Sequence, residues 1–326
     1  MRILLTVDLA WNILNFRMGI VGALIKAGHG VVVLAPGDGS GLVAAGVRHI
    51  PLEMDAKGLN PLSGLAMVAR MTRHFRELRP DVVLSWTIKN NIFGAMAARR
   101  VGVPFIPNVS GLGTAFLSGG ALQFVAQTLY RYAFKPLDTV FFQNTEDRDL
   151  FASRRLVAAK QARLLPGSGI DLAHFGPAPI PDGPPVFLMI GRLLRDKGVV
   201  EYADAARIVR AAHPAARFQL LGALDADNRS AIPEAMLRAW QAEGIIDYLG
   251  TAPDVRPAIA AAHCIVLPSY REGAPRTLIE AAAMARPVIA TDVPGCRAVV
   301  DSGKTGLLCA ARSGAALADA CIAFLA

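Results

Sequence analysis

Short apolar runs alternate with longer amphipathic stretches along the whole chain, and this alternation limits the fold more than any other feature. In the first half, the expected strands are Ile3 to Val7, Val31 to Leu34, Val82 to Leu84, Phe105 to Pro107 and Thr139 to Phe142. The expected helices between them include Arg17 to Ala27, Pro61 to Leu78 and Ile92 to Val101. Strands that alternate with helices in this way form parallel sheets, so the sequence predicts an α/β fold with doubly wound sheets.

A second set of strands follows a segment rich in proline and glycine, Gly176 to Pro185. These strands are expected at Val186 to Ile190, Phe218 to Leu221, Ile246 to Leu249, Cys264 to Leu267 and Val288 to Ala290. A chain of 326 residues is long for one hydrophobic core. We therefore expect two Rossmann-like domains, residues 1–166 and 186–326, joined by a linker over residues 167–185. Neither first strand is followed by G-x-G-x-x-G, which argues against a nicotinamide dehydrogenase.

Two carboxylates lie eight residues apart in Glu272-Gly-Ala-Pro-Arg-Thr-Leu-Ile-Glu280. If a helix begins with Pro275 as a favoured first residue, Glu280 lies in its first turns and Glu272 in the preceding loop. The first N–H groups of such a helix would point toward an anion, and they belong to Arg276, Thr277 and Leu278. The segment therefore fits a diphosphate-binding site. The alternative is an ordinary amphipathic helix whose acids are favoured by the helix dipole.

A basic loop, Gly191-Arg-Leu-Leu-Arg-Asp-Lys-Gly198, separates the expected strand Val186 to Ile190 from a helical pattern over Val199 to Ala212. Open α/β folds bind ligands at the carboxyl edge of their parallel sheets, and a loop of this kind places cations there. Arg192 is suited to hold a phosphate with two N–H groups, and Lys197 adds a mobile point charge. A solvated basic loop is the alternative.

Together, these two segments resemble the retaining glycosyltransferases of the GT-B fold, in family 4, which is typified by bacterial polysaccharide and lipopolysaccharide sugar transferases. The resemblance continues through Leu165 to Asp171, Tyr248 to Val255 and Arg286 to Asp292. The first half is more similar to transferases that extend lipid-linked oligosaccharides, because Asn108-Val-Ser-Gly-Leu-Gly113 follows Thr87-Ile-Lys-Asn-Asn91. Nearly the whole chain takes part in the resemblance, most strongly from Leu165 to Leu308.

The resemblance implies a role for each matched residue. Glu280 would hydrogen-bond the ribose hydroxyls of the donor. The expected catalytic residues are Glu272, on the hydroxyls of the donor sugar, and Arg192 with Lys197, on the diphosphate. Further donor contacts are expected from Gly191, Val255, Arg276, Thr277, Leu278, Gly111 and Gly113. The last two belong to a loop whose glycines allow close backbone approach, and a structural turn is the alternative for this loop.

Acceptor contacts are expected from a loop near the N-terminus and from the segment after the strand Val82 to Leu84. The residues that would hold the acceptor or its phosphate are Asp8, Asn12, Arg17 and Lys89. For Asn12 and Arg17 a turn and a helix start are an equally good interpretation, and a lysine at position 89 is more often exposed.

No pair of nucleophile and general base stands out in the sequence. The six histidines are scattered, and none has the spacing of a metal site or lies beside a motif serine. His263 is expected to be a packed or edge histidine. Cations and helix N-termini would instead stabilise the departing nucleoside diphosphate, which requires neither a metal nor a cofactor besides the nucleotide sugar. The resemblance implies retention of the anomeric configuration, with the leaving phosphate assisting deprotonation of the acceptor.

The sequence thus predicts a hexosyl- or N-acetylhexosaminyltransferase that uses a nucleotide-diphosphate donor, with UDP as the expected nucleotide. The acceptor would be a polyprenyl-diphosphate-linked saccharide in the assembly of cell-surface glycans. A nucleotide-sugar 2-epimerase shares the architecture and is one alternative. A non-catalytic donor-binding subunit is another, because the chain stops within the helix expected at Ala315 to Leu325, whereas the family continues with helices that cross back onto the first domain.

Positive charge is concentrated in the first half. Residues 1–165 contain 19 lysines and arginines and 10 acids, against 15 and 16 in the remainder. An anionic membrane surface fits this half better than nucleic acid does, because no nucleic-acid-binding motif appears. A stripe of arginines three residues apart would contact the membrane, or would form a solvated helix face: Arg70, Arg73, Arg76 and Arg79.

The compartment is inferred from what the sequence lacks. No apolar run is long enough for a transmembrane helix, and the N-terminus reads as a strand rather than a signal peptide. Four cysteines without metal-like spacing are expected to be reduced and mostly buried: Cys264, Cys296, Cys309 and Cys321. We therefore expect a cytoplasmic protein that associates peripherally with the inner face of the membrane.

Overall fold

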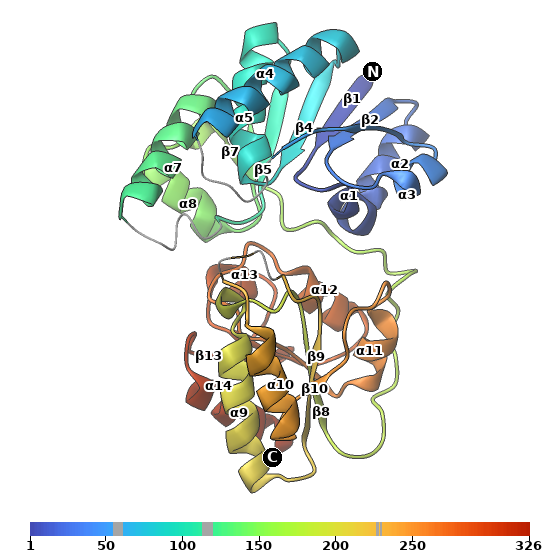
Figure 1. Ribbon diagram of the computed structural model, residues 1–326, viewed down its shortest axis with the longest axis vertical. Helices are drawn as coiled ribbons and strands as arrows, with labels where there is room; N and C mark the ends of the chain where they lie inside the picture. The colour runs from blue at the N-terminus through green and yellow to red at the C-terminus, as the bar shows by residue number, and fades with distance from the viewer. Residues whose placement is uncertain (55–60, 113–119, 226–227, 229) are drawn as a thin grey trace. The chain divides into compact units, whose positions relative to one another are not determined.

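The computed structural model describes residues 1–326 except 55–60, 113–119, 226–227 and 229. The chain divides into two compact units, Met1–Ser168 and Gly169–Ala326, and each is described by itself (Figure 1). Most of the segment expected as a linker belongs to the second unit, because Phe175 is buried in that unit's core and Ile170 packs against it.

The first unit is a parallel sheet with helices on both faces. Within the described ranges it has seven strands in the order β3-β2-β1-β4-β5-β6-β7. They are β1 (Arg2–Thr6), β2 (Gly30–Ala35), β3 (Arg48–Pro51), β4 (Val82–Trp86), β5 (Phe105–Val109), β6 (Val140–Phe142) and β7 (Ala162–Leu164). The helices are α1 (Ala10–Phe16), α2 (Met18–Lys26), α3 (Ser40–Ala44), α4 (Pro61–Leu78), α5 (Ile88–Val101), α7 (Gly120–Phe134) and α8 (Thr145–Ser153).

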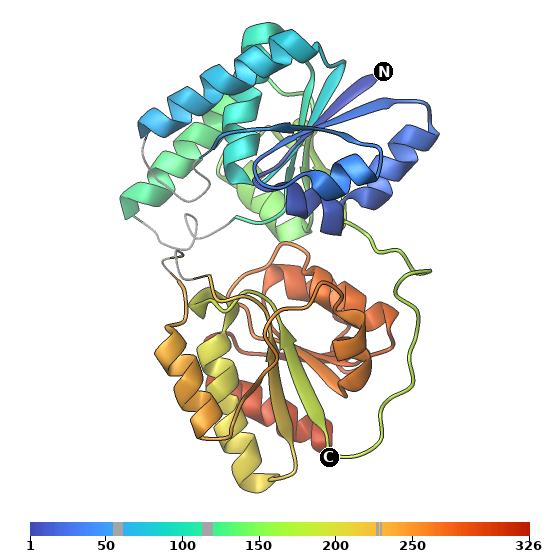
Figure 2. The ribbon, with the colours of Figure 1, turned by 45° about the vertical axis from the view of Figure 1, so that its right-hand side comes forward.

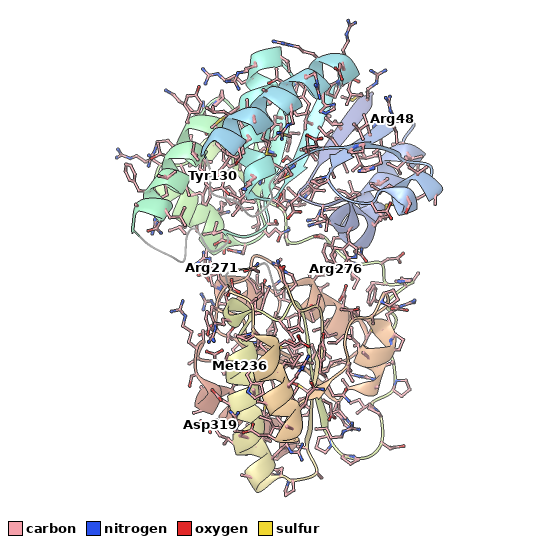
Figure 3. All side chains as sticks on the ribbon, in the orientation of Figure 1. Arg48, Tyr130, Met236, Arg271, Arg276 and Asp319 are labelled. Carbon is pink, nitrogen blue, oxygen red and sulfur yellow. The ribbon has the colours of Figure 1, made fainter. Side chains whose placement is uncertain are left out.

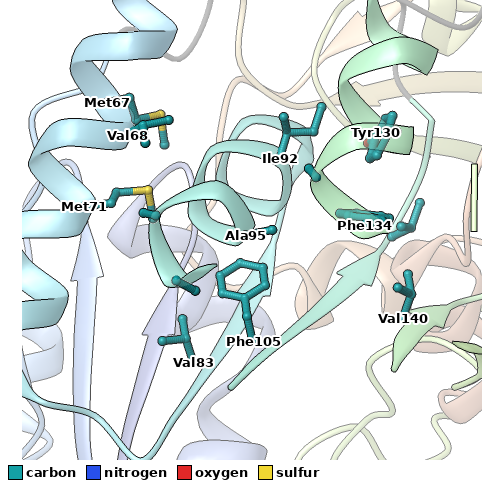
Figure 4. Close-up of a cluster of buried hydrophobic side chains, with 14 of the residues drawn as sticks. Met67, Val68, Met71, Val83, Ile92, Ala95, Phe105, Tyr130, Phe134 and Val140 are labelled. Atoms are coloured by element: carbon teal, nitrogen blue, oxygen red, sulfur yellow. The ribbon is translucent and has the colours of Figure 1, made fainter. Parts of the chain in front are cut away.

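Alternate residues of each strand enter different cores, because successive side chains of a strand point to opposite faces of the sheet. On β1, Leu4 packs under α4, α5, α7 and α8, whereas Ile3 and Leu5 pack under α1, α2 and α3. Figure 4 shows the larger core, in which Met71 of α4, Ile92 of α5 and Phe134 of α7 surround strand residues such as Val83 and Phe105. Strands covered on both faces in this way read as continuous apolar runs.

The second unit repeats the design. Its described residues form six parallel strands in the order β10-β9-β8-β11-β12-β13. They are β8 (Val186–Ile190), β9 (Arg217–Leu221), β10 (Asp247–Tyr248), β11 (Cys264–Leu267), β12 (Val288–Thr291) and β13 (Gly306–Cys309). The helices are α9 (Val199–Ala212), α10 (Glu234–Ala242), α11 (Arg256–Ala261), α12 (Arg276–Ala283), α13 (Pro294–Arg297) and α14 (Gly314–Leu325), with a 3₁₀ turn, η2 (Arg195–Lys197). Figure 2 shows α9 and α10 on one side of this sheet and α11 and α12 on the other.

The strand orders give each sheet a point where the chain reverses the direction in which it adds strands. In the first unit this point lies between β1 and β4, and in the second unit between β8 and β11. Loops that leave neighbouring strands in opposite directions open a crevice at the carboxyl edge of the sheet, and ligands of open α/β folds bind there. The fold therefore marks one candidate site in each unit.

Several expected elements are confirmed, among them the strand Cys264–Leu267 and the helices Pro61–Leu78 and Val199–Ala212. The expected helix Arg17 to Ala27 is confirmed as α2, which has Arg17 and Ala27 as its caps. The loop expected before it contains the helix α1, and Arg17, with φ −132°, separates α1 from α2. The helix α5 begins four residues before the expected Ile92. Its polar first turn is possible because Asn90 donates to Thr6 Oγ1 at 2.8 Å and Asn91 donates to the Asn108 carbonyl at 2.9 Å.

Arg286 is fully buried and joins separate segments of the second unit. Its guanidinium donates to the carbonyls of Ile259 at 3.1 Å, Ala260 at 2.8 Å and Ala178 at 2.8 Å. One guanidinium thus ties α11 to the segment that enters the unit. Buried carbonyl groups without a donor are costly, so this arginine acts as a structural clamp.

We expect Arg286→Met to lower the free energy of unfolding by about 3 kcal/mol or more, because it leaves several buried carbonyls without a donor. Urea unfolding followed by the fluorescence of buried Trp240 in the same unit measures this change. Arg238→Met is the control, since Arg238 forms an exposed pair with Glu234 and should lose less than about 1 kcal/mol. Equal losses in the two variants would contradict the clamp.

Candidate functional site

The loops after β8 and β11 form the candidate site of the second unit. Gly191 and Arg192 directly follow β8, and the loop that carries Glu272 follows β11. These strands are neighbours, with Ile265 opposite Leu188. Figure 3 labels Arg271 and Arg276 at this end of the unit, whereas Met236 lies on a helix away from it.

Lys197 and Glu272 form an ion pair at the centre of this site. The distance from Lys197 Nζ to Glu272 Oε1 is 2.5 Å, and only 28% and 12% of the two side chains is exposed. Gly198 makes the approach possible, because its φ is +77° and a Cβ there would lie 2.1 Å from the Pro268 carbonyl oxygen. Only glycine fits both this backbone conformation and this space. Two residues predicted to be catalytic are therefore brought together, although they lie 75 positions apart.

Arg276 and Glu280 form a second ion pair, one turn apart on α12. Arg276 Nε donates to Glu280 Oε1 at 2.7 Å, and Glu280 is 8% exposed. Burial raises the pKa of Glu280 above its ordinary value, and the bond to Arg276 opposes this rise. The site thus holds a desolvated carboxylate beside an arginine, an arrangement suited to accept hydrogen bonds from hydroxyl groups.

The start of α12 differs from the expectation in two respects. Pro275 is the N-cap and not the first helical residue, since its ψ of 116° is extended. The Leu278 N–H donates to the Pro275 carbonyl at 3.2 Å and the Leu278 side chain lies in the core, so this amide does not point toward an anion. By helix geometry, the N–H groups of Arg276 and Thr277 are the ones without a carbonyl acceptor inside the helix.

Arg192 lies at the edge of the site. Its Nη1 is 3.2 Å from Asp225 Oδ2, and 58% of its side chain is exposed. The Gly191 N–H donates to the Leu221 carbonyl at 3.0 Å, so Gly191 extends the pairing of β8 with β9. Val255 is the N-cap of α11 and packs partly against the core. For these three residues, a role in donor binding stays a prediction.

Tyr270, which no motif in the sequence marks, joins the two halves of the site. Its N–H donates to the Asp196 carbonyl at 2.9 Å, and its hydroxyl donates to Glu201 Oε1 at 2.6 Å. The Arg312 guanidinium lies 4.7 Å from the centre of its ring. Burial, with a further contribution from Glu201, raises the pKa of Tyr270 to about 12. The loop of Glu272 is therefore fastened to the turn that ends in Lys197, which nothing in the local sequence pattern reveals.

The residues expected to hold the acceptor surround the reversal point of the first unit. Asp8 follows β1, Asn12 lies on α1, and Lys89 lies in the first turn of α5, after β4. Arg17 is buried, with its guanidinium 5.1 Å from the centre of the Trp86 ring, and Nη1 donates to Ser168 Oγ. The structure thus gathers these four residues around the ends of β1 and β4.

Two further features of the first unit bear on a ligand. Asn12 Oδ1 is buried and has no hydrogen-bond partner in the described part of the chain, so a ligand hydroxyl or amine would satisfy it. Gly111 follows β5 at the same carboxyl edge, and Gly113 lies outside the described residues.

Across the described residues, no group of three or more His, Cys, Asp or Glu side chains could hold a metal ion. His263 is packed, since its Nδ1 accepts from the Val186 N–H at 3.1 Å, and the four cysteines are free and buried. None of the described helices combines the length and the hydropathy needed to cross a membrane.

Two family models together match most of the chain. The model described as "Glycosyl transferase 4-like domain" matches residues 16–168, and the model described as "Glycosyl transferases group 1" matches residues 184–326. Each match falls within one structural unit.

Three curated relatives are similar to this chain. The N,N'-diacetylbacillosaminyl-diphospho-undecaprenol alpha-1,3-N-acetylgalactosaminyltransferase of Campylobacter jejuni is 28% identical over 91% of this chain and 82% of its own length. The UDP-Gal:alpha-D-GlcNAc-diphosphoundecaprenol alpha-1,3-galactosyltransferase of Escherichia coli is 25% identical over 80% and 68%. A GDP-mannose-dependent alpha-mannosyltransferase of Mycolicibacterium smegmatis is 28% identical over 91% and 80%.

The fold is that of solved glycosyltransferase structures. Sucrose-phosphate synthase of Thermosynechococcus elongatus superimposes with a TM-score of 0.80 at 21% identity, over 100% of this chain and 90% of that chain. Two Rossmann-like units, both family models and this likeness agree with one another. The chain belongs to the GT-B glycosyltransferases of family 4.

Proposed function

We propose that this glycosyltransferase moves a sugar from a UDP-linked donor to a polyprenyl-diphosphate-linked saccharide, with retention of the anomeric configuration. The proposal rests on two ion pairs at the β8–β11 reversal point. Lys197 pairs with Glu272, and Arg276 pairs with Glu280. Two of the relatives are named for acceptors linked to diphospho-undecaprenol, and this supports the choice of acceptor.

In this proposal the second unit binds the donor. Lys197 and Arg192 bind the diphosphate, and the N–H groups at the start of α12 add partial positive charge beside it. Glu280 accepts hydrogen bonds from the ribose hydroxyls, and Glu272 accepts them from the hydroxyls of the sugar. Each carboxylate is already oriented by a cation, so little ordering is needed when the donor arrives.

Charge stabilisation supplies the catalysis. Breaking the bond between sugar and diphosphate develops negative charge on the leaving oxygen, and a fixed cation near that oxygen lowers the barrier. Lys197 has this position in the proposal. The leaving phosphate accepts the proton of the attacking hydroxyl on the same face of the sugar, so the mechanism uses neither a protein base nor a metal.

The acceptor binds to the first unit in this proposal, near Asp8, Asn12, Arg17 and Lys89. The two cations suit the acceptor diphosphate, and the unpartnered Asn12 Oδ1 suits a sugar hydroxyl or amide. Because such an acceptor is anchored in a lipid bilayer, we propose that the enzyme works at the cytoplasmic face of the membrane as a peripheral protein.

One experiment tests the whole proposal. The protein is incubated with a panel of UDP-sugars and with GDP-mannose, each with and without a polyprenyl-diphosphate-linked saccharide. Transfer of sugar to the lipid from a UDP-sugar supports the proposal, and transfer only from GDP-mannose overturns the choice of nucleotide. Interconversion of free nucleotide sugars would indicate the epimerase, and binding without turnover would indicate a non-catalytic subunit.

We expect Lys197→Ala to lower turnover by about one to three orders of magnitude, because it removes a charged stabiliser of the leaving group. The measurement is the steady-state rate with saturating donor. Lys304→Ala is the matched control, since Lys304 pairs with Asp301 on the surface of the same unit. The Lys304→Ala enzyme should have the turnover of the wild type. Unchanged turnover in Lys197→Ala would remove this residue from the mechanism.

We expect Glu280→Gln to weaken UDP binding about 10- to 100-fold, the effect of losing a charge-assisted hydrogen bond. Glu234→Gln on α10 is the control, because Glu234 pairs with Arg238 at the same spacing but is exposed. Calorimetry with UDP alone compares the two. Tight binding by Glu280→Gln would leave Glu280 as an ordinary acid near a helix start.

The raised pKa of Glu280 gives this prediction a pH dependence. A folded-state pKa above the unfolded one means that ionisation of Glu280 lowers the free energy of unfolding as pH rises through these values. Removing the carboxylate in Glu280→Gln should therefore not lower the free energy of unfolding at neutral pH through the ionisation of residue 280. Acidification should weaken UDP binding by the wild type, which loses its carboxylate, more than binding by the variant.

Tyr270 is expected to act as a positioning residue for the Lys197–Glu272 pair. Tyr270→Phe removes the bond to Glu201 and should lower turnover about tenfold through misplacement of the pair, with UDP affinity unchanged. In the background of Lys197→Ala it should have little further effect, because the cation that it positions is gone. Tyr202→Phe is the control for a purely structural hydroxyl, since Tyr202 donates to the Phe187 carbonyl in the core. Multiplicative losses from Tyr270→Phe and Lys197→Ala would contradict the positioning role.

A further inference from the structure

The helix α7 exposes large apolar side chains on its outer face. Phe124 is 70% exposed, Tyr132 60% and Val125 51%. Val125 and Tyr132 are seven residues apart, so they lie about two turns apart on one side of the helix, and Phe124 lies on the adjoining part of the exposed surface. Tyr130 and Phe134, on the other side, are buried in the core of the first unit. The helix is thus apolar on both faces, and the core accounts for only one of them.

The segment from β4 through α7 carries positive charge only, whereas α8, which packs beside α7, carries Glu146, Asp147 and Asp149. The sequence has no aspartate or glutamate from residue 82 to residue 137, although it has Lys89, Arg99, Arg100, Arg131 and Lys135. The Arg99 guanidinium, at the end of α5, lies 5.8 Å from the centre of the Tyr132 ring. Arg131 donates to the carbonyls of Arg154 and Arg155 at 3.2 Å, so the end of α7 lies beside the segment that follows α8. We call Phe124, Val125, Tyr132, Arg99 and Lys135 the α7 surface.

The combination has the chemistry of a helix that lies in a membrane interface. Such a helix buries phenylalanine and valine at the boundary of the acyl chains, keeps the hydroxyl of tyrosine at the headgroups, and extends arginine and lysine to anionic phosphates. Residues 1–165 carry 19 lysines and arginines against 10 acids, and this excess of positive charge complements an anionic lipid surface.

The arginine stripe on α4 is a weaker candidate for the same contact. Arg70 lies 4.0 Å from Glu53 and Arg73 lies 4.0 Å from Glu77, so acids offset part of its charge. The apolar residues beside the stripe, Met67, Met71 and Phe75, are buried in the core. The stripe therefore offers charge to a membrane without the aromatic side chains that the α7 surface adds.

We propose that the α7 surface docks the first unit on an anionic lipid bilayer, with Phe124, Val125 and Tyr132 inserted at the interface and Arg99 and Lys135 on the headgroups. The benefit to catalysis rests on the proposed function, since only a lipid-linked acceptor profits from docking. The docking itself requires neither donor nor acceptor, so it can be tested without them.

The test is co-sedimentation of the full chain with vesicles of phosphatidylcholine alone or mixed with an equal share of phosphatidylglycerol. We expect the wild type to bind the anionic vesicles, and Phe124→Ser with Tyr132→Ser to lower the partition at least about tenfold. Val43→Ser is the matched control, since Val43 is 62% exposed on α3 of the same unit and should bind normally. Equal binding by the aromatic variant and the wild type would overturn the proposal.

Charge reversal separates the two candidate surfaces. Arg99→Glu with Lys135→Glu should abolish binding at physiological salt, whereas Arg73→Glu with Arg76→Glu on α4 should weaken it much less. An equal loss from both pairs, or binding to neutral vesicles as strong as to anionic ones, would refute docking through the α7 surface. Self-association without lipid that Phe124→Ser abolishes would mark the face as a contact between copies of the chain and would also overturn the proposal.

Transfer rates with acceptor in micelles and in vesicles distinguish a failure of membrane docking from a failure of the proposed function. With acceptor in detergent micelles, the α7 variants should transfer sugar at the wild-type rate, and with acceptor in anionic vesicles they should be at least about tenfold slower. Absence of transfer by the wild type in micelles would count against the proposed function and leave the vesicle-binding result intact. Equal rates of the variants and the wild type in vesicles would contradict docking.

Discussion

The pairing of β11 with β8 is the contact on which the donor site depends. It joins Cys264 to Phe187 and Ile265 to Leu188, and it is the point from which β9 and β10 extend to one side and β12 and β13 to the other. The loops after these two strands leave the sheet next to each other, and the chain then continues to opposite sides of the sheet. Lys197 and Glu272 meet because of this topology, and Gly198 allows the meeting because it has no side chain to collide with Pro268.

The site balances its charges before any ligand binds. Glu272 and Glu280 are largely removed from water, and each has a cation within 2.7 Å. Each ion pair fixes the direction in which its carboxylate points. In the proposed reaction, Lys197 shares its charge between Glu272 and the diphosphate. Its interaction with the diphosphate strengthens as the leaving group gains charge, and this difference between ground state and transition state is what accelerates a reaction.

Strands that are buried on both faces were predicted correctly from the sequence. A short continuous apolar run such as Val186–Ile190 is typical of a strand in a parallel sheet covered by helices on both sides. The prediction missed β3, β7 and β13, three short strands at or near the edges of their sheets, two of which contain charged residues. Edge strands bury less surface, so whether such a segment forms a strand depends more on pairing with a neighbouring strand than on its own amino-acid composition. The start of α5 was misplaced for a different reason, because Asn90 and Asn91 are buried and form hydrogen bonds with partners far away in the sequence.

The candidate site was predictable to the extent that its chemistry is local. A basic loop after a strand and two acids around a helix start can be read from spacing alone. The partner of each charge cannot, because Lys197 and Glu272 are joined by the order of the strands. Tyr270 was missed for the same reason, since a tyrosine in a loop gives no sign that its hydroxyl reaches Glu201 on another element.

The helix α5 links the two proposed tasks of the first unit. Its first turn carries Lys89 beside the reversal point of the sheet, and its last turn carries Arg99 beside Tyr132 of α7. At 1.5 Å per residue, about 15 Å of helix axis separates the two positions. Both ends are fixed by the same core, since Ile92, Ala95 and Ala98 of α5 are buried in it. A unit that docks through α7 would therefore hold its acceptor residues at a constant distance from the bilayer, which would favour a saccharide whose reactive sugar stands off from the lipid by a matching length.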